Sequence, residues 1–255
     1  MKIVAIANQK GGVGKTTTAI NLSAGLGIKG LKVLLVDLDP QANSTSGLGI
    51  EKEVIKHDIF DVLIADVKFK DAIVKTKTKN VDIVPSTIQL AGAEIYLSSP
   101  KNSKQKIFNH FFKEVKNNYD YLIIDCPPSL GLINRNALSA ADQVLIPIQA
   151  EYYALEGLTQ LLSTIKLVKK MYNPQLQIGG IFLTMFDYRI ILGKEVRDEV
   201  IKFFKEKVFV TTIPRNIKLS EAQSTGQSIF DYKSTSKGAI AYMELVEEFL
   251  KVNGD

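Results

Sequence analysis

Cysteine is almost absent from this sequence. Cys126 is the only one in 255 residues, so the chain cannot form an internal disulfide or hold a metal cluster that needs two cysteines per chain. No apolar run approaches the roughly 20 residues of a membrane-spanning helix. Residues 3–7 already form an expected strand, which leaves no room for a signal peptide, so we expect a cytoplasmic protein.

Internal repeats, low-complexity tracts and linkers are also absent. With 45% hydrophobic and 23% charged residues, the chain can bury a full core, and this composition favours one domain over residues 1–255. The net charge of +5 permits an anionic partner such as nucleic acid without requiring one. We expect Cys126 to be a small buried residue rather than a reactive thiol.

Apolar runs of strand length alternate with helical patterns along the chain. This alternation predicts an α/β fold, with a mostly parallel twisted sheet and helices on both faces. We also expect one or two amphipathic helices in residues 54–77, and a final helix over residues 236–251. The final helix should turn four residues to the core: Ile240, Met243, Val246 and Leu250. The expected strands cover residues 3–7, 32–37, 81–84, 121–125, 144–148 and 178–185.

A glycine-rich segment joins the first expected strand to the first helix. Gly11, Gly12 and Gly14 can adopt conformations closed to other residues, so successive backbone N–H groups can point at one anion. The helix N-terminus adds a partial positive charge there. Lys15 would reach the β- and γ-phosphates of a nucleotide, and the Thr16 hydroxyl would ligate Mg²⁺. The expected nucleotide-binding segment is Lys10, Gly11, Gly12, Val13, Gly14, Lys15, Thr16 and Thr17.

This segment departs from the ordinary phosphate-loop pattern at one position. Gln9 stands where the ordinary motif has its first glycine, and Lys10 adds a second lysine at the front of the loop. In these residues the chain resembles the deviant Walker A ATPases, which include the ParA/Soj partition proteins, the MinD division-site proteins and the nitrogenase iron protein. The resemblance implies a P-loop NTPase in which Lys10 crosses a dimer interface to the partner's nucleotide. The alternative is a glycine-rich turn with a solvated lysine.

Carboxylates stand at the ends of two expected strands. Asp37 and Asp39 close the second strand, and Asp125 closes the strand that begins at Tyr121. Ligands bind at the carboxyl ends of the strands in open α/β sheets, so these side chains should face the phosphate loop. Asp125 would hold a water of the Mg²⁺ shell. The alternative for Asp37 and Asp39 is a cap or turn at a strand end.

Two further assignments follow from the resemblance. The Asp of an Asp-Pro-Gln sequence positions the attacking water in this family, which gives that role to Asp39 and places Asp37 near the Mg²⁺ shell. The segment from Pro214 to Ala222 is similar to a Pro-Arg-Asn…Leu-Ser-Glu-Ala motif of the ParA/Soj group. In that motif the first three residues cradle the adenine, here Pro214, Arg215 and Asn216.

Several features favour the ParA/Soj group over its relatives. MinD-type proteins bind membrane through a C-terminal helix with a basic face, whereas this chain ends in a helix that carries Glu244, Glu247 and Glu248. The iron–sulfur branch needs paired cysteines, which are missing. The chain also has no N-terminal helix-turn-helix extension, so it resembles the short, chromosome-type members.

The resemblance covers nearly the whole chain and implies a function. It implies an ATPase that uses Mg²⁺ and ATP, forms a homodimer with ATP, binds non-specific double-stranded DNA on the nucleoid and acts with a ParB-type protein, without a membrane. Lys10 and Lys15 would neutralise the transferring phosphoryl group. Residues 151–157 match a stretch found at the dimer interface. Two other functions stay open: a membrane-cycling regulator like MinD, and an ATP-switched regulator of replication that does not hydrolyse ATP.

The expected DNA contacts also come from the resemblance. Arg189 and Lys218 match basic positions that contact DNA in the ParA/Soj group. Lys218 replaces the arginine common there, which keeps the charge but loses the planar fork. The alternative is two solvated surface cations. Lys101 to Lys116 is rich in lysine, but we expect a solvated basic face there rather than a DNA contact.

Overall fold

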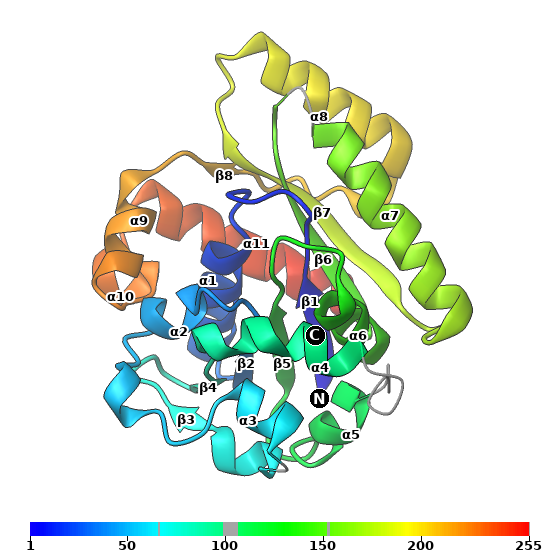
Figure 1. Cartoon of the computed structure of the whole chain (residues 1–255). Coiled ribbons are helices and arrows are strands. Elements are labelled where there is room, and N and C mark those ends of the chain that lie inside the picture. Colours follow the sequence, from blue (N-terminus) through cyan, green and yellow to red (C-terminus); the bar gives the residue numbers. More distant parts are fainter. Residues whose placement is uncertain (66, 99–106, 152–153, 255) are drawn as a thin grey trace.

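An eight-stranded sheet forms the centre of the molecule in the computed structural model, which describes residues 1–65, 67–98, 107–151 and 154–254 (Figure 1). The strand order is β3-β4-β2-β5-β1-β6-β7-β8, and every pair except β3 with β4 is parallel. The predicted α/β fold is therefore confirmed. The strands are β1 (Lys2–Ile6), β2 (Val33–Asp37), β3 (Val74–Lys75), β4 (Val81–Val84), β5 (Tyr121–Asp125), β6 (Gln143–Gln149), β7 (Gln177–Phe186) and β8 (Ile213–Pro214).

Helices cover both faces of this sheet. The α-helices are α1 (Lys15–Ile28), α2 (Asn43–Gly47), α3 (Ile59–Ile64), α4 (Ala93–Ser98), α5 (Ile107–Lys113), α6 (Leu132–Ala140), α7 (Ala154–Met171), α8 (Ile191–Phe204), α9 (Ile217–Ser224), α10 (Ile229–Lys233) and α11 (Lys237–Asn253). Short 3-10 helices are η1 (Lys52–Val54), η2 (Phe69–Ala72), η3 (Ile88–Gly92) and η4 (Lys205–Lys207). Every helix in the described part of the chain is too short or too polar to cross a bilayer.

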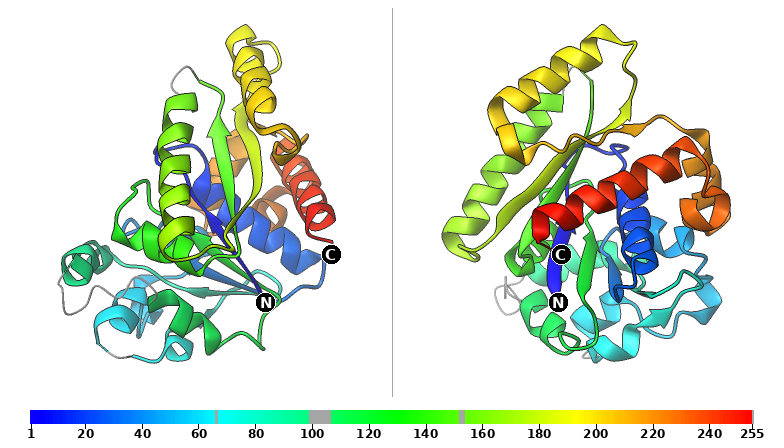
Figure 2. Two further views of the ribbon diagram at one scale, coloured as in Figure 1. Left: turned by 90° about the vertical axis from the view of Figure 1, so that its right-hand side faces the viewer. Right: turned by 180° about the vertical axis from the view of Figure 1, so that it is seen from behind.

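Two hydrophobic cores lie on opposite faces of the sheet. Successive side chains of a strand point to opposite faces, and in β2 the residues Leu34 and Val36 enter one core while Val33 and Leu35 enter the other. The first core is closed by α3 to α8, and the second by α1, α9, α10 and α11. Figure 2 shows α7 (green) and α11 (red) on opposite sides of the sheet.

The last helix faces the core with a different stripe from the one expected. Ala239, Tyr242, Val246 and Phe249 are buried, whereas Ile240 is 53% exposed. The expected stripe was therefore wrong for Ile240, while Met243 and Leu250 pack at the edge of the core. Burying the Tyr242 and Phe249 rings removes more apolar area from water than burying Ile240, and the Tyr242 hydroxyl also lies 3.1 Å from Thr18 Oγ1 of α1.

The prediction for residues 54–77 was only partly right. The helix α3 is short and is capped by Asp58, whose side chain accepts a hydrogen bond from the N–H of Asp61, while the Asp61 side chain accepts one from the N–H of Asp58. The segment then forms η2 and the antiparallel edge strand β3. Parts of two expected segments, residues 101–106 and 152–153, lie outside the described residues.

Candidate functional site

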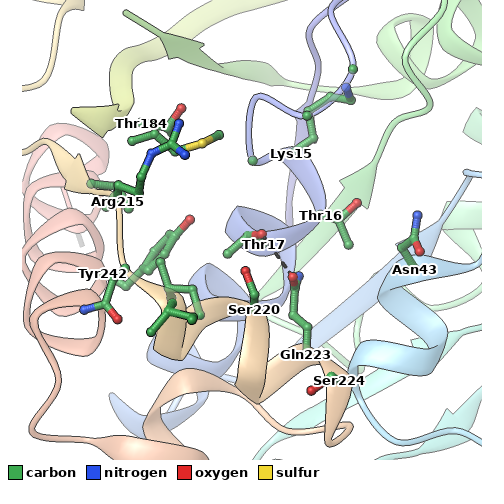
Figure 3. A pocket seen from close by; sticks show the side chains of 18 of the residues that line it. Lys15, Thr16, Thr17, Asn43, Thr184, Arg215, Ser220, Gln223, Ser224 and Tyr242 are labelled. Atoms are coloured by element: carbon green, nitrogen blue, oxygen red, sulfur yellow. Dashed lines mark hydrogen bonds between the residues drawn. The ribbon is translucent and has the colours of Figure 1, made fainter. Parts of the chain in front are cut away.

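The glycine-rich segment forms the turn between β1 and α1, in the middle of the sheet. β1 lies between β5 and β6, so the turn leaves the sheet at the carboxyl edge of its central strands. A cavity of about 980 Å³ opens beside it (Figure 3). The cavity lining includes Gly11, Gly12, Gly14, Lys15, Thr16, Thr17, Asp39, Pro214, Arg215 and Asn216. Four other residues of the predicted nucleotide and Mg²⁺ site lie outside this lining: Lys10, Val13, Asp37 and Asp125.

The backbone of the turn requires glycine at two positions. Gly12 has φ +75° and Gly14 has φ +87°, in the left-handed region that residues with a Cβ rarely adopt. Gly14 is also the N-cap of α1, and its position provides no side chain to bond the first N–H groups of the helix. These N–H groups and the positive end of the helix are therefore available to an anion in the cavity.

Lys15 is folded back onto the turn. Its Nζ donates a hydrogen bond to the backbone oxygen of Lys10 at 2.9 Å, and its side chain is largely buried. Burial lowers the pKa of Lys15, while the negative charge of Asp125 acts in the opposite direction. A cation in this position is attractive to an anion because water shields it poorly.

Lys10 takes a different direction from Lys15. Its Nζ lies 2.5 Å from Glu151 Oε2, and both side chains are accessible, with exposed fractions of 36% and 50%. The ion pair joins the turn to the segment that follows β6, and the sequence analysis did not predict it. Lys10 therefore lies at the rim of the site and pairs with its own chain.

Asp125 has one oxygen that no protein group satisfies. Its Oδ2 accepts a hydrogen bond of 2.7 Å from the Ser44 hydroxyl, but the buried Oδ1 has no hydrogen-bond partner. Burial raises the pKa of this carboxyl, although the hydrogen bond from Ser44 and the neighbouring Thr16 favour its charged form. A buried oxygen without a partner is costly, and a metal-bound water would satisfy it. Asp125 therefore fits the Mg²⁺ role that its position predicts.

Asp37 is occupied by its own chain. Its Oδ2 accepts hydrogen bonds from the N–H and the hydroxyl of Thr45, at 2.9 and 2.8 Å, and its Oδ1 accepts one from the N–H of Asp39 at 3.1 Å. Burial and the neighbouring Asp125, its register partner on β5, raise the pKa of Asp37. These contacts agree with the alternative in which Asp37 organises a turn. Its place near a Mg²⁺ shell stays a prediction.

Asp39 faces the cavity from the same turn. Its Oδ1 accepts a hydrogen bond from the N–H of Gln41 at 2.9 Å, which fixes the side chain in an Asx turn. The residue is largely buried and lines the cavity together with Lys15 and Thr16. A carboxylate held in this way can orient a water molecule beside the phosphate loop.

The opposite wall of the cavity comes from the C-terminal third of the chain. Pro214 ends β8, and Asn216 begins α9 by accepting a hydrogen bond of 2.9 Å from the N–H of Lys218. Figure 3 shows Arg215 across the cavity from Lys15. The Thr17 hydroxyl donates to Gln223 Oε1 at 3.4 Å, so α9 is also joined to α1.

Thr184 supports the phosphate loop, although the sequence analysis missed it. Its hydroxyl donates a buried hydrogen bond of 2.9 Å to the backbone oxygen of Val13. The next residue, Met185, has φ +50° and lines the cavity. A threonine inside an apolar strand is ordinary, so no local pattern marks it. The role of Thr184 becomes visible only in the structure, where β7 lies next to the phosphate loop.

The two expected DNA contacts leave the same edge of the sheet. β7 and β8 are parallel neighbours, and Arg189 and Lys218 each follow the carboxyl end of one of these strands. The side chain of Arg189 is 89% exposed and that of Lys218 is 43% exposed. Both are paired with carboxylates of their own chain, Arg189 with Asp187 and Lys218 with Glu221.

We predict that Thr184→Val weakens the phosphate loop. The substitution removes the donor to Val13 O, and a buried oxygen left without a partner costs about 1–3 kcal/mol of the free energy of unfolding. Nucleotide binding should weaken as well, because the loop loses a support. Denaturant unfolding and titration with ATP measure both effects.

The matched control is Thr164→Val, which removes a weaker hydroxyl contact within α7, far along the chain from the loop. It should leave ATP affinity unchanged. Equal ATP affinity for Thr184→Val and the parent would show that this hydrogen bond does not support the loop.

Comparison with known proteins agrees with this geometry. A family model described as "AAA domain" matches residues 1–178. The sporulation initiation inhibitor protein Soj of Bacillus subtilis is 55% identical over 247 residues, which is 97% of each chain. The chromosome partitioning protein ParA of Myxococcus xanthus is 48% identical over 250 residues, 98% of this chain and 88% of the relative.

A solved structure is also similar over the whole chain. It is cobyrinic acid a,c-diamide synthase from Mycobacterium smegmatis with bound ADP and magnesium, at 35% identity and a TM-score of 0.85. The match covers 100% of this chain and 96% of that one. The relatives with the higher identities are the Soj and ParA proteins, and their similarity extends over both walls of the cavity. This chain therefore belongs to the ParA/Soj family of P-loop partitioning ATPases.

Proposed function

We propose that this chain is a single-domain, ATP-dependent, dimerising ATPase that segregates chromosomal or plasmid DNA. The ATP-bound homodimer binds non-specific double-stranded DNA on the nucleoid, in the cytoplasm, and hydrolysis releases it. A ParB-type protein is its partner and stimulates a slow basal activity. The main support is one cavity that unites the phosphate loop with the segment from Pro214 to Asn216, two motifs from opposite ends of the chain.

Nucleotide binding in this proposal divides the cavity between two walls. Gly11 to Thr17 hold the phosphates through backbone N–H groups and the positive end of α1, while Pro214, Arg215 and Asn216 hold the adenine. Lys15 exchanges its hydrogen bond to Lys10 O for a phosphate oxygen. The relative with bound ADP and magnesium has the same fold, which supports ATP and Mg²⁺ as the ligands here.

Mg²⁺ fits the residues on the other side of the phosphate loop. Thr16 offers a hydroxyl as a direct ligand, and the unsatisfied Oδ1 of Asp125 offers an acceptor for a metal-bound water. Asp37 lies beside Asp125 on the neighbouring strand, close to the expected Mg²⁺ shell. When bound, Mg²⁺ neutralises charge on the β- and γ-phosphate oxygens.

Hydrolysis depends on a water held in line with the γ-phosphate. Asp39 orients this water through its carboxylate, which the N–H of Gln41 fixes in direction. Lys15 stabilises the negative charge that moves in the transition state, and Lys10 of the partner subunit adds a second cation. The chain itself does little covalent chemistry, so positioning and charge account for the rate.

Dimerisation requires Lys10 to leave Glu151. Exposed ion pairs of this kind contribute about 0.2–1 kcal/mol, which is less than a charge-assisted hydrogen bond to a phosphate in a water-poor interface provides. A nucleotide of the partner can therefore displace Glu151. The ion pair with Glu151 orients Lys10 in the monomer, and breaking it costs little free energy when Lys10 moves to the partner's nucleotide.

We predict opposite outcomes for two substitutions at the site. Lys15→Ala should abolish ATP binding, because it removes the cation that holds the phosphates. Asp39→Ala should keep ATP binding but trap the ATP dimer, because only the orientation of water is lost. Binding and single-turnover hydrolysis assays separate the two. If Asp39→Ala hydrolyses ATP about as fast as the parent, Asp39 does not orient the attacking water.

The same assays test the alternative function. A parent that binds ATP without hydrolysing it would favour the regulator that uses ATP only as a switch.

Lys10→Ala should bind ATP moderately well yet stay monomeric, because the cation that joins the two subunits is missing. Light scattering with and without ATP measures this. Glu151→Gln is the matched control: it breaks the same ion pair but leaves Lys10, so it should dimerise at least as well as the parent. If Lys10→Ala dimerises normally, Lys10 does not cross the interface.

DNA binding gives the direct test of the proposed function. A dimer presents Arg189 and Lys218 twice and neutralises at least four phosphates, so log affinity against log salt should slope by roughly −3.6 where no other group competes for these cations. Binding should need ATP, because a monomer offers half the contacts. The double variant Arg189→Ala with Lys218→Ala should lose most of the affinity in ATP at low salt. Equal binding by this variant, or equal binding by the parent without nucleotide, would contradict the proposal.

A further inference from the structure

The two cations assigned to DNA share one feature: each is already held by a carboxylate of its own chain. Asp187 stands two residues before Arg189, and Glu221 stands one helical turn after Lys218. Both pairs lie on segments that follow neighbouring strands, β7 and β8. A phosphate that binds either cation therefore has to compete with a carboxylate that is already in place.

The pair of Asp187 and Arg189 uses two nitrogens of the guanidinium. Arg189 Nε donates to Oδ1 at 2.9 Å and to Oδ2 at 3.2 Å, and Nη2 donates to Oδ2 at 2.6 Å. The backbone N–H of Arg189 donates to the same Oδ1 at 3.0 Å. These bonds lower the pKa of Asp187 to about 2, so it remains charged under all ordinary conditions. The carboxylate takes the forked geometry by which arginine also binds phosphate.

The pair of Lys218 and Glu221 has a third member. Lys218 Nζ lies 2.7 Å from Glu221 Oε2, and the Tyr232 hydroxyl donates to the same oxygen at 2.8 Å. These contacts lower the pKa of Glu221 and raise that of Lys218. Tyr232 comes from α10, so the acceptor is held by two neighbouring helices. Glu221 is thus fixed beside Lys218.

We propose that Asp187 and Glu221 determine when the surface binds DNA, because they occupy its two cations until a duplex displaces them. The inference rests on the proposed function and deepens it. Exchanging one exposed carboxylate for one phosphate gains little free energy, so a single subunit binds DNA poorly. A dimer exchanges carboxylates for phosphates at twice as many places on one duplex, and linking the sites gives an overall affinity well above that of either subunit. The carboxylates therefore make DNA binding depend on the ATP dimer.

This competition should change how the affinity for DNA depends on salt concentration. A cation that binds DNA releases counterions from the phosphates. A carboxylate that loses its partner collects a counterion from solution, which offsets part of that release. The parent should therefore have a shallower slope than a variant in which the carboxylate is neutral.

The test is Asp187→Asn. Asparagine keeps an oxygen for the N–H of Arg189 and has nearly the same shape, so the turn is retained while the charge is lost. The affinity for duplex DNA in ATP should rise roughly threefold for each subunit, and so roughly tenfold for a dimer. The salt slope should steepen, and binding without nucleotide should become detectable. Glu221→Gln should change affinity in the same direction, and the Tyr232 hydroxyl can still donate to the new amide oxygen.

A matched control separates this effect from a general change of charge. Glu199→Gln breaks the exposed pair of Glu199 and Lys202 on α8, with the same loss of one negative charge. It should change DNA affinity much less. The gain of Asp187→Asn should also vanish when Arg189→Ala is added, because no cation is then left to release.

Different results would overturn the proposed function and the competition by Asp187 and Glu221. A parent that does not bind DNA in ATP overturns the proposed function. A parent that binds DNA, with Asp187→Asn and Glu221→Gln no tighter than the parent, overturns only the competition. An equal gain in Glu199→Gln, or a gain that persists without Arg189, also overturns it, since the effect would then come from net charge alone.

Discussion

The turn between β1 and α1 is the constraint on which the rest of the structure depends. Gly12 and Gly14 bend the backbone through the left-handed region, and α1 begins directly afterwards without a side-chain cap. A turn of this kind leaves N–H groups unpaired unless an anion meets them. The surrounding elements hold it in place: Thr184 of β7 supports its backbone, and Gln223 of α9 bonds the first turn of α1.

Charge is distributed in two layers around this turn. The inner layer is buried, with Lys15 near Asp125 and Asp39, and burial lowers the pKa of Lys15 and raises that of Asp125. The outer layer is exposed, and its cations Lys10 and Arg189 are bound to Glu151 and Asp187. Buried groups suit nucleotide and metal chemistry, whereas exposed pairs exchange partners at small cost.

Local patterns predicted the strands well but the helix faces less well. The runs at 81–84 and 121–125 coincide with β4 and β5, because a fully buried parallel strand is a short apolar run with clear ends. The face of α11 was misjudged at Ile240, because two apolar stripes one residue apart both have helical spacing. The choice between them depended on what the helix meets, namely α1 and its Thr18.

The sequence by itself determined the parts of the site that are formed by residues close together in the chain. The glycines and Lys15 of the loop, Asp125 at its strand end and the segment from Pro214 to Asn216 each follow from local spacing or from a motif. Tertiary structure alone decided which groups face one another. Thr184 meets Val13 and Glu151 meets Lys10 only because separate strands end side by side, and the short helix after β2 brings Thr45 to Oδ2 of Asp37. Contacts between distant segments depend on the register and order of the strands, which no local pattern specifies.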